Sequence, residues 1–305
     1  MKKKFKSFLK IWLFLGVIFL VYGGYRFFSK SIWDGRSRLN LILGGEQVKV
    51  FSLNPQERSM ILLTFPPNTF LKVVYGYGDY PVESIYNLGR LGEHRGEELL
   101  QASFQENLEV PIDGYLWKQK GNLSFKNLLN QALFSHQVLT NLNKWDVLRL
   151  WWQVRGIRPG SAGLVEVDLE KAGVLSEVVL ADESRGFQID AEKISLTLEK
   201  YFKDEKLRQE DIPLAILNGT RHSALAAKAK RLVNHLGGRV VEVGEWEEQI
   251  SGCQLRAARS KLQSFTFLKL QKIFNCQWAG EDLGNHYAEI ILILGEDYWE
   301  KINGK

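Results

Sequence analysis

The alternation of apolar and polar residues changes character early in the chain. Residues 8–28 are almost continuously apolar and are interrupted only by Lys10 and Arg26. From about residue 40 onward, short apolar runs alternate with longer segments in which apolar residues recur every three or four positions. The first pattern is typical of a membrane span, and the second of strands and amphipathic helices. The sequence therefore predicts an N-terminal transmembrane helix followed by an α/β protein.

The apolar segment has the length and flanks of a membrane anchor. Its 21 residues (8–28) extend about 30 Å as a helix, which matches the hydrocarbon core of a bilayer. Five lysines among the first ten residues place the N-terminus in the cytoplasm and the bulk of the chain outside. A cleaved signal peptide is the alternative, but Tyr, Arg and Phe occupy positions 25–28, where a cleavage site needs small residues. We expect residues 1–30 to form a single-pass signal-anchor in the cell membrane.

Two α/β units are expected outside the membrane, at residues 31–189 and 212–300. Residues 190–211 connect them, as a polar helix (190–207) followed by a charged linker. In the first unit the pattern predicts strands at 40–45, 48–53, 61–65, 110–117 and 164–169, and helices at 96–108, 123–134 and 144–154. In the second it predicts strands at 213–218, 239–244, 253–257 and 288–295, and helices at 224–238 and 261–274. The β-α-β-β-α-β order of the second unit favours a small ferredoxin-like sandwich with both helices on one sheet face.

The charge and motif content exclude several functions. Lys and Arg outnumber Asp and Glu by 40 to 35, but five of the lysines belong to the N-terminal tip, so we expect no nucleic-acid partner. The five histidines have no zinc spacing, and Glu46, Asp79 and Asp113 are too scattered for a metal site, so no metal is predicted. Neither a Gly-x-Ser-x-Gly nor a phosphate-loop pattern occurs.

The second unit resembles the C-terminal domain of LytR-type envelope proteins. The resemblance lies in IPLAILNGTRHSALAAKAKRLVNHLGGRVVEVG (212–244), with its Asn-Gly-Thr turn and alanine-rich helix, and in the closing IILILGEDY (290–298). About 85 residues are covered, and several elements occur in the same order as in that domain.

The first unit resembles a reduced LytR-CpsA-Psr domain. EQVKVFSLNP (46–55) is similar to the family's Asp-Thr-Ile strand that leads into Ser-Leu-Asn-Pro, and LLTFPPNTFL (62–71) to its Ser-Ile-Pro-Arg-Asp-Thr segment. NLILGG, VPIDGYLW and TNLNKWDVLRLWW fit further segments. The resemblance implies an envelope protein of the class that transfers glycopolymers from polyprenyl-pyrophosphate carriers to peptidoglycan.

The departures from that family concern the residues that would perform the transfer. The family's arginine falls on Pro67 and its aspartate on Asn68, while the earlier carboxylate falls on Glu46. A pyrophosphate needs fixed cations, which proline cannot supply. The family's later arginine-rich stretch is also missing, since no arginine occurs between Arg95 and Arg149. We therefore predict no catalytic residues, with Glu46, Arg90 and Arg95 as the residual candidates.

The Asn218-Gly219-Thr220 turn of the second unit has two interpretations. As a binding site, its backbone N–H groups would receive a polar or anionic ligand at a helix start. As a structural turn, Gly219 would supply an unusual backbone angle while Thr220 or Ser223 caps the helix. The structural interpretation is favoured.

Two further groups of residues bear on function. Trp145, Trp151 and Trp152 could form a carbohydrate- or membrane-facing platform, although their helical spacing favours core packing. Cys253 and Cys276 are the only cysteines, and a disulfide between them is possible if one begins a strand and the other ends the following helix.

The sequence favours a membrane-anchored, extracytoplasmic and non-catalytic binding or scaffolding protein of cell-wall assembly, with peptidoglycan or a polyprenyl-linked glycan as candidate partners and no cofactor. The alternative is an active glycopolymer transferase using Glu46, Arg90 and Arg95, and only this alternative involves magnesium. A transcription regulator, suggested by the historical naming of such proteins, is disfavoured by the membrane segment and the lack of a DNA-reading motif.

Overall fold

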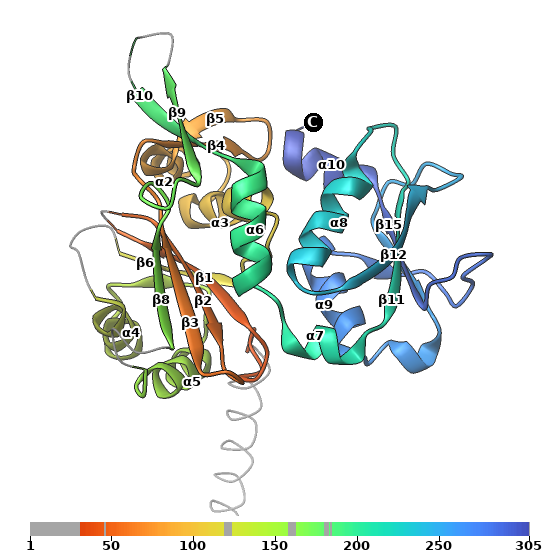
Figure 1. The fold of residues 1–305 in the computed structure, drawn as a ribbon, viewed down its shortest axis with the longest axis horizontal. Helices are drawn as coiled ribbons and strands as arrows, with labels where there is room; N and C mark the ends of the chain where they lie inside the picture. The colour runs from red at the N-terminus through yellow and green to blue at the C-terminus, as the bar shows by residue number, and fades with distance from the viewer. Residues whose placement is uncertain are drawn as a thin grey trace, which may run out of the picture.

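The computed structural model describes residues 31–45, 47–118, 124–157, 163–179, 183 and 185–304. The predicted membrane span at 8–28 and the candidate residue Glu46 lie outside the described residues. Within the described ranges, no helix is both long and apolar enough to cross a bilayer. The architecture is mixed α/β with three sheets (Figure 1).

The first unit is built on a six-stranded sheet, called here the large sheet, in the order β7-β6-β1-β2-β3-β8. Its strands are β1 (Leu39–Gly44), β2 (Lys49–Asn54), β3 (Ser59–Thr64), β6 (Gly114–Trp117), β7 (Leu139–Thr140) and β8 (Leu164–Asp168). β1, β2 and β3 form an antiparallel meander, while β6 runs parallel to β1 and β8 parallel to β3. The turn between β1 and β2, the end of β3 and the end of β8 therefore lie at the same edge of the sheet.

Helices cover both faces of the large sheet. Ile42, Val50 and Ile61 point to one face, where they join a core with α2 (Val82–Leu91), α3 (Gly96–Leu108) and α6 (Ala191–Tyr201). This side is called the α3 face. Alternate residues such as Leu41 and Phe51 point the other way and pack against α4 (Phe125–Phe134) and α5 (Lys144–Val154). This second side is called the α4 face. The predicted strands and helices of this region occur, with their ends shifted by a few residues.

Several elements of the first unit are absent from the sequence prediction. A four-stranded sheet contains β5 (Gly78–Pro81), β4 (Thr69–Val73), β10 (Arg185–Ile189) and β9 (Leu175–Val179), in that order. β5, β9 and β10 are short and largely half-exposed, so they lack the apolar runs that predict strands. The expected helix at 190–207 is wrong in extent. α6 ends at Tyr201, and a separate helix α7 (Glu205–Glu210) begins after Asp204, whose side chain accepts a hydrogen bond from the Lys206 N–H.

The second unit has its predicted elements in their predicted places, but the ferredoxin-like topology is wrong. Its sheet has the order β12-β11-β15-β13-β14, and β11 is parallel to both of its neighbours. The strands are β11 (Pro213–Asn218), β12 (Arg239–Glu245), β13 (Gln254–Ala257), β14 (Gln277–Trp278) and β15 (Ile290–Leu294). In a ferredoxin-like sheet the third strand lies beside the first, whereas here β11 lies between the parallel strands β12 and β15, and β13 pairs with β15. β11 is buried along nearly its whole length, as is typical of a strand between parallel neighbours.

The helices of the second unit cover one face of its sheet, as expected. α8 (Leu225–His235), α9 (Phe265–Phe274) and the additional α10 (Glu296–Asn303) share a core with Leu214, Ile216 and Leu292. The opposite face, with Leu217 and Ile293, is covered by side chains of loops.

Complementary charges join the two units. Glu106 and Glu109 of the first unit pair with Lys228 (3.0 Å) and Arg231 (2.6 Å) of α8. Asp113 pairs with Lys269 of α9 at 3.1 Å, with both side chains nearly buried. In Figure 1, α6 and α8 run along this junction. The first unit supplies the carboxylates and the second the cations, so each unit satisfies the charges of the other.

Candidate ligand-binding site

The loop that follows β3 holds no ionisable side chain between Pro66 and Thr69. Its polar groups are used within the fold. The Thr69 N–H donates to the Pro66 carbonyl (3.0 Å), and the Glu83 N–H at the start of α2 donates to the Pro67 carbonyl (3.1 Å). The Asn68 side-chain amide donates to the Arg185 carbonyl of β10 (3.0 Å). This loop connects the two sheets of the first unit and presents no acid, base or cation.

The space beneath the loop is filled by side chains. Phe65 is fully buried, and its ring meets that of Phe104 edge to face with centroids 4.9 Å apart. Leu63 and Leu71 are also buried in this core. One group is poorly accommodated, because the buried Thr69 hydroxyl has no hydrogen-bond partner among the described residues.

The structure brings Arg90 and Arg95 to one end of the α2–α3 pair, where both influence the phenol of Tyr86. Arg95 is exposed and forms ion pairs with Glu97 (2.6 Å) and Glu98 (3.4 Å). Its guanidinium also lies 3.4 Å from the Tyr115 hydroxyl. Burial raises the pKa of Tyr115, and the Arg95 charge opposes that rise. Because two carboxylates already neutralise Arg95, it is poorly suited to clamp a pyrophosphate.

The opposite side of the large sheet contains a cavity of about 310 Å³. Its apolar lining comes from the α4 face of the sheet, from α4 and from the end of α5: Leu43, Phe51, Met60, Leu62, Phe125, Leu128, Val154, Ile157 and Leu164. The rings of Phe51 and Phe125 lie 4.2 Å apart at one wall. The volume lies at the lower end of the range of about 300–1,000 Å³ that is typical of ligand sites. It can hold a short apolar chain.

The polar groups of the cavity carry a net positive charge. Gln47, Lys49, Ser124, Lys126 and Glu166 are its polar lining residues. Two of these side chains are cationic and Glu166 is anionic, and no ion pair of Lys49 or Lys126 occurs among the described residues. Ser124 begins α4, where its hydroxyl accepts a hydrogen bond from the Asn127 N–H. Apolar walls with two lysines suit an amphiphile that has an anionic head group.

Of the residues that the sequence analysis selected, the two arginines are not part of this cavity. Arg90 and Arg95 lie with α2 and α3 on the α3 face, and neither lines the cavity. The sequence does contain a partial signal, because Phe51, Met60 and Leu62 share one face of adjacent strands by alternation. That alternation does not reveal that α4 leaves part of this face uncovered.

The Asn218-Gly219-Thr220 turn is closed by its own hydrogen bonds. The Asn218 amide donates to the Glu245 carboxylate (2.8 Å) and to the His222 carbonyl (3.0 Å), and its oxygen accepts from the Thr220 hydroxyl (2.9 Å). Gly219 is required for close packing, since an added Cβ would lie 2.8 Å from the Ile250 side chain. Its φ is not positive, so the expected unusual angle is wrong. The expected cap is also wrong, because α8 begins after Ala224 without a side-chain cap. Ligand binding by this turn stays a prediction.

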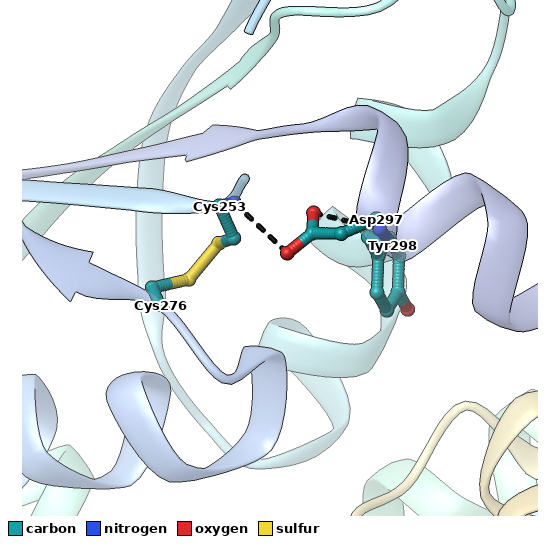
Figure 2. Close-up of a disulfide and its surroundings, with 4 residues drawn as sticks. All are labelled: Cys253, Cys276, Asp297 and Tyr298. Atoms are coloured by element: carbon teal, nitrogen blue, oxygen red, sulfur yellow. Dashed lines mark hydrogen bonds between the residues drawn. A yellow bond between two sulfur atoms is a disulfide. The ribbon is translucent and has the colours of Figure 1, made fainter. Parts of the chain in front are cut away.

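The Gly-Glu-Asp-Tyr segment (295–298) and the cysteines form one structural corner of the second unit. Figure 2 shows the Asp297 carboxylate accepting a hydrogen bond from the Cys253 N–H (3.1 Å), next to the disulfide that joins Cys253 to Cys276. Cys253 precedes β13 and Cys276 follows α9, with their Cα atoms 4.5 Å apart. Burial raises the pKa of Tyr298 well above its usual value, and nearby Glu106 adds to the rise. These groups stabilise the fold and the junction of the units.

The tryptophans of α5 divide between core and surface. Trp145 and Trp151 are half-buried, and the Trp151 indole N–H donates to Asn130 (3.0 Å). Trp152 is 65% exposed, contrary to the favoured core role. Among the carboxylates considered for a metal, Asp113 pairs with Lys269, and no group of three or more metal-binding side chains occurs in the described residues.

Comparisons with known proteins give weak structural similarities. No family model and no curated protein matches the chain. The crystal structure of TagV from Bacillus subtilis is 12% identical, covers 67% of this chain and 98% of TagV, and has a TM-score of 0.42. TagU from the same organism is 11% identical, with 52% of this chain and 93% of TagU covered and a TM-score of 0.37. A structure described as TagT bound to LIIa-WTA is 12% identical. The match covers 68% of this chain and 95% of the TagT chain, with a TM-score of 0.41. Similarity at this level does not establish a shared function.

Proposed function

We propose that this chain is a membrane-anchored, extracytoplasmic protein of cell-envelope assembly that binds an amphiphile with an anionic head group and performs no chemistry on it. A polyprenyl-linked glycan is the ligand of this kind that the sequence resemblance suggests. The single observation that carries the proposal is the cavity of about 310 Å³ on the α4 face, with its apolar walls and two lysines.

The surroundings of the β3 loop support the non-catalytic part of the proposal. Phosphoryl transfer depends on positioned cations and a proton acceptor, because the protein must neutralise the charge that develops on the phosphate oxygens. The loop supplies none of these groups, and the α3 face beneath it is filled. Arg95, the best placed cation of that face, is paired with Glu97 and Glu98.

The location outside the membrane is supported by the predicted anchor and by the disulfide. Five lysines precede the apolar segment 8–28, which directs the following chain outward. Cys253 and Cys276 form a disulfide, a bond that persists in oxidising compartments.

Binding of a short-chain polyprenyl pyrophosphate to segment 31–305, with the matching alcohol as control, tests the proposal. We expect micromolar binding of the pyrophosphate, weaker binding of the alcohol, and no requirement for magnesium. The double change Lys49→Gln with Lys126→Gln is expected to weaken binding about tenfold, or about 1.4 kcal/mol, because it removes both cavity ammonium groups. Unchanged affinity of this variant would contradict the assignment of the cavity.

Arg90→Gln with Arg95→Gln is the matched control, since it also removes two cations but on the opposite side of the sheet. The proposed function predicts that this variant binds normally. The transferase alternative predicts the reverse pattern, together with release of the carrier when a lipid-linked glycan and peptidoglycan are supplied.

A further inference from the structure

An exposed stripe of apolar and cationic side chains runs along α5. Lys144, Leu148, Trp152 and Arg155 recur at spacings of four, four and three residues, which places them on one side of the helix. Leu148 is 42% exposed and Trp152 is 65% exposed. The Arg155 guanidinium lies 5.0 Å from the centre of the Trp152 ring. These four residues are called the α5 stripe. Neither the cavity nor the proposed ligand uses them.

The end of α4 extends this surface. Phe134, its last residue, is 86% exposed. The Lys144 ammonium donates to the Leu133 carbonyl (3.0 Å), which holds the end of α4 beside the start of the α5 stripe. The only acidic residue of α5, Asp146, is fully buried and therefore leaves the positive charge of the stripe uncompensated on this side of the helix. Large exposed apolar side chains that gather in one place mark an interaction surface.

The N-terminal segment reaches the folded unit at the first turn of α5. The Ser31 hydroxyl and the Ile32 N–H both donate to the Asp146 carboxylate in the first turn of α5. The Arg149 guanidinium donates to the Trp33 carbonyl (2.6 Å). The predicted span ends at Phe28, three Cα steps before Ser31, so Ser31, which contacts the first turn of α5, lies within about 11 Å of the end of that span. In Figure 1, α5 forms the lower edge of the first unit.

We infer that the α5 stripe and Phe134 rest on the outer surface of the membrane that holds the anchor. Tryptophan prefers the head-group region of a bilayer, and lysine and arginine can reach lipid phosphates from a partly embedded helix. The pairing of Trp152 and Leu148 with Lys144 and Arg155 fits anionic phospholipid. α4 and α5 also wall the cavity, so this contact brings the helical wall of the cavity against the bilayer. The inference rests on the membrane anchor of the proposed function.

The test uses the full chain, reconstituted in vesicles of phosphatidylglycerol and phosphatidylcholine that carry a spin-labelled lipid. Single cysteines are introduced by Leu148→Cys and Trp152→Cys and labelled with a polarity-sensitive fluorophore without reduction, since both native cysteines are in the disulfide. Leu91→Cys and Tyr287→Cys are the controls, because these residues are 88% and 94% exposed and lie on other elements. We expect at least threefold stronger lipid quenching at 148 and 152 than at the controls, and weaker quenching when phosphatidylglycerol is omitted.

Flotation of the vesicles distinguishes a failure of the membrane anchor from a failure of the contact between the α5 stripe and the bilayer. Chain that fails to float with the vesicles contradicts the anchor and with it both proposals. Chain that floats, but shows equal lipid quenching at all four positions, overturns the membrane contact and leaves the anchor intact. Labels at 148 and 152 that are shielded from both the lipid quencher and aqueous iodide would indicate a protein partner or self-association, and would also overturn it. Near-UV circular dichroism of each variant checks that the fold is retained.

Discussion

The two faces of the large sheet differ in how completely they are covered. On the α3 face, Leu63, Phe65 and Phe104 are fully buried beneath the loop that resembles a catalytic segment. On the α4 face, the same strands border a cavity of about 310 Å³. The loop without ionisable groups thus stands over a solid core, while the room for a ligand lies on the other side of the sheet. One sheet thus has a closely packed face and a face with room for a ligand.

The largest expected effect comes from truncating adjacent leucines of β3 that face opposite sides. Leu63→Ala should lower the free energy of unfolding by about 2–5 kcal/mol, because it opens a cavity in a filled core. Leu62→Ala should lower it by only about 1 kcal/mol, since Leu62 is half-buried and already borders empty space. Urea unfolding of segment 31–305, followed by circular dichroism, measures both. Equal losses would mean that the two faces are equally well packed.

Filling the cavity should weaken binding while leaving the fold intact. Leu62→Trp places a larger side chain at the cavity wall and should weaken binding of the polyprenyl pyrophosphate at least tenfold, or about 1.4 kcal/mol. Leu91→Trp, at a position 88% exposed on α2, makes the same change in volume away from the cavity and should have no effect. Isothermal titration calorimetry with each variant gives the comparison. Undiminished binding by Leu62→Trp would place the ligand elsewhere.

Removing the unpaired Thr69 hydroxyl beneath the β3 loop should have a smaller effect, and it should raise the free energy of unfolding rather than lower it. Thr69→Val keeps the shape of the side chain and removes a buried polar group that has no partner among the described residues. We expect the protein to become more stable by about 1 kcal/mol, with ligand affinity unchanged. Urea unfolding and titration calorimetry of the same sample measure the two quantities. A loss of binding would show that this hydroxyl still serves a ligand on the α3 face.

The smallest expected effect is that of Arg95→Gln. Its side chain is 61% exposed and already paired with Glu97 and Glu98, so its removal should change ligand affinity by less than about twofold. The titration should be repeated at low salt, where any long-range contribution of the charge is largest. A tenfold loss would make Arg95 part of a pyrophosphate site and would favour the transferase alternative.

The sequence predicts the elements of the second unit better than their arrangement. β11 and α8 occur within a few residues of their predicted bounds, because a continuous apolar run and a helical repeat are local properties. Strand neighbours depend on contacts between distant segments, and the ferredoxin-like order was therefore wrong. The sequence does not reveal β5, because it is half-exposed and has no strong apolar pattern.

Only part of the candidate site could be predicted from the sequence, because the cavity also depends on contacts between distant segments. The lack of ionisable groups in the loop at 66–69 is visible in the sequence itself and needs no structure to be recognised. The cavity is bordered by Phe51 and Phe125, which are 74 positions apart in the chain, and no local pattern encodes an unfilled space. The close approach that requires Gly219 likewise depends on Ile250 and β15.

Photo-crosslinking with a polyprenyl pyrophosphate that carries a diazirine on its prenyl chain tests the central claim most directly, when the adducts are mapped by mass spectrometry on segment 31–305. The account predicts adducts on the cavity lining, at Met60, Phe125 and Leu128, that disappear in the Leu62→Trp variant. Adducts on α2 and α3 around Tyr86 and Arg95, undiminished in that variant, would contradict it and place the ligand on the face that resembles a catalytic one.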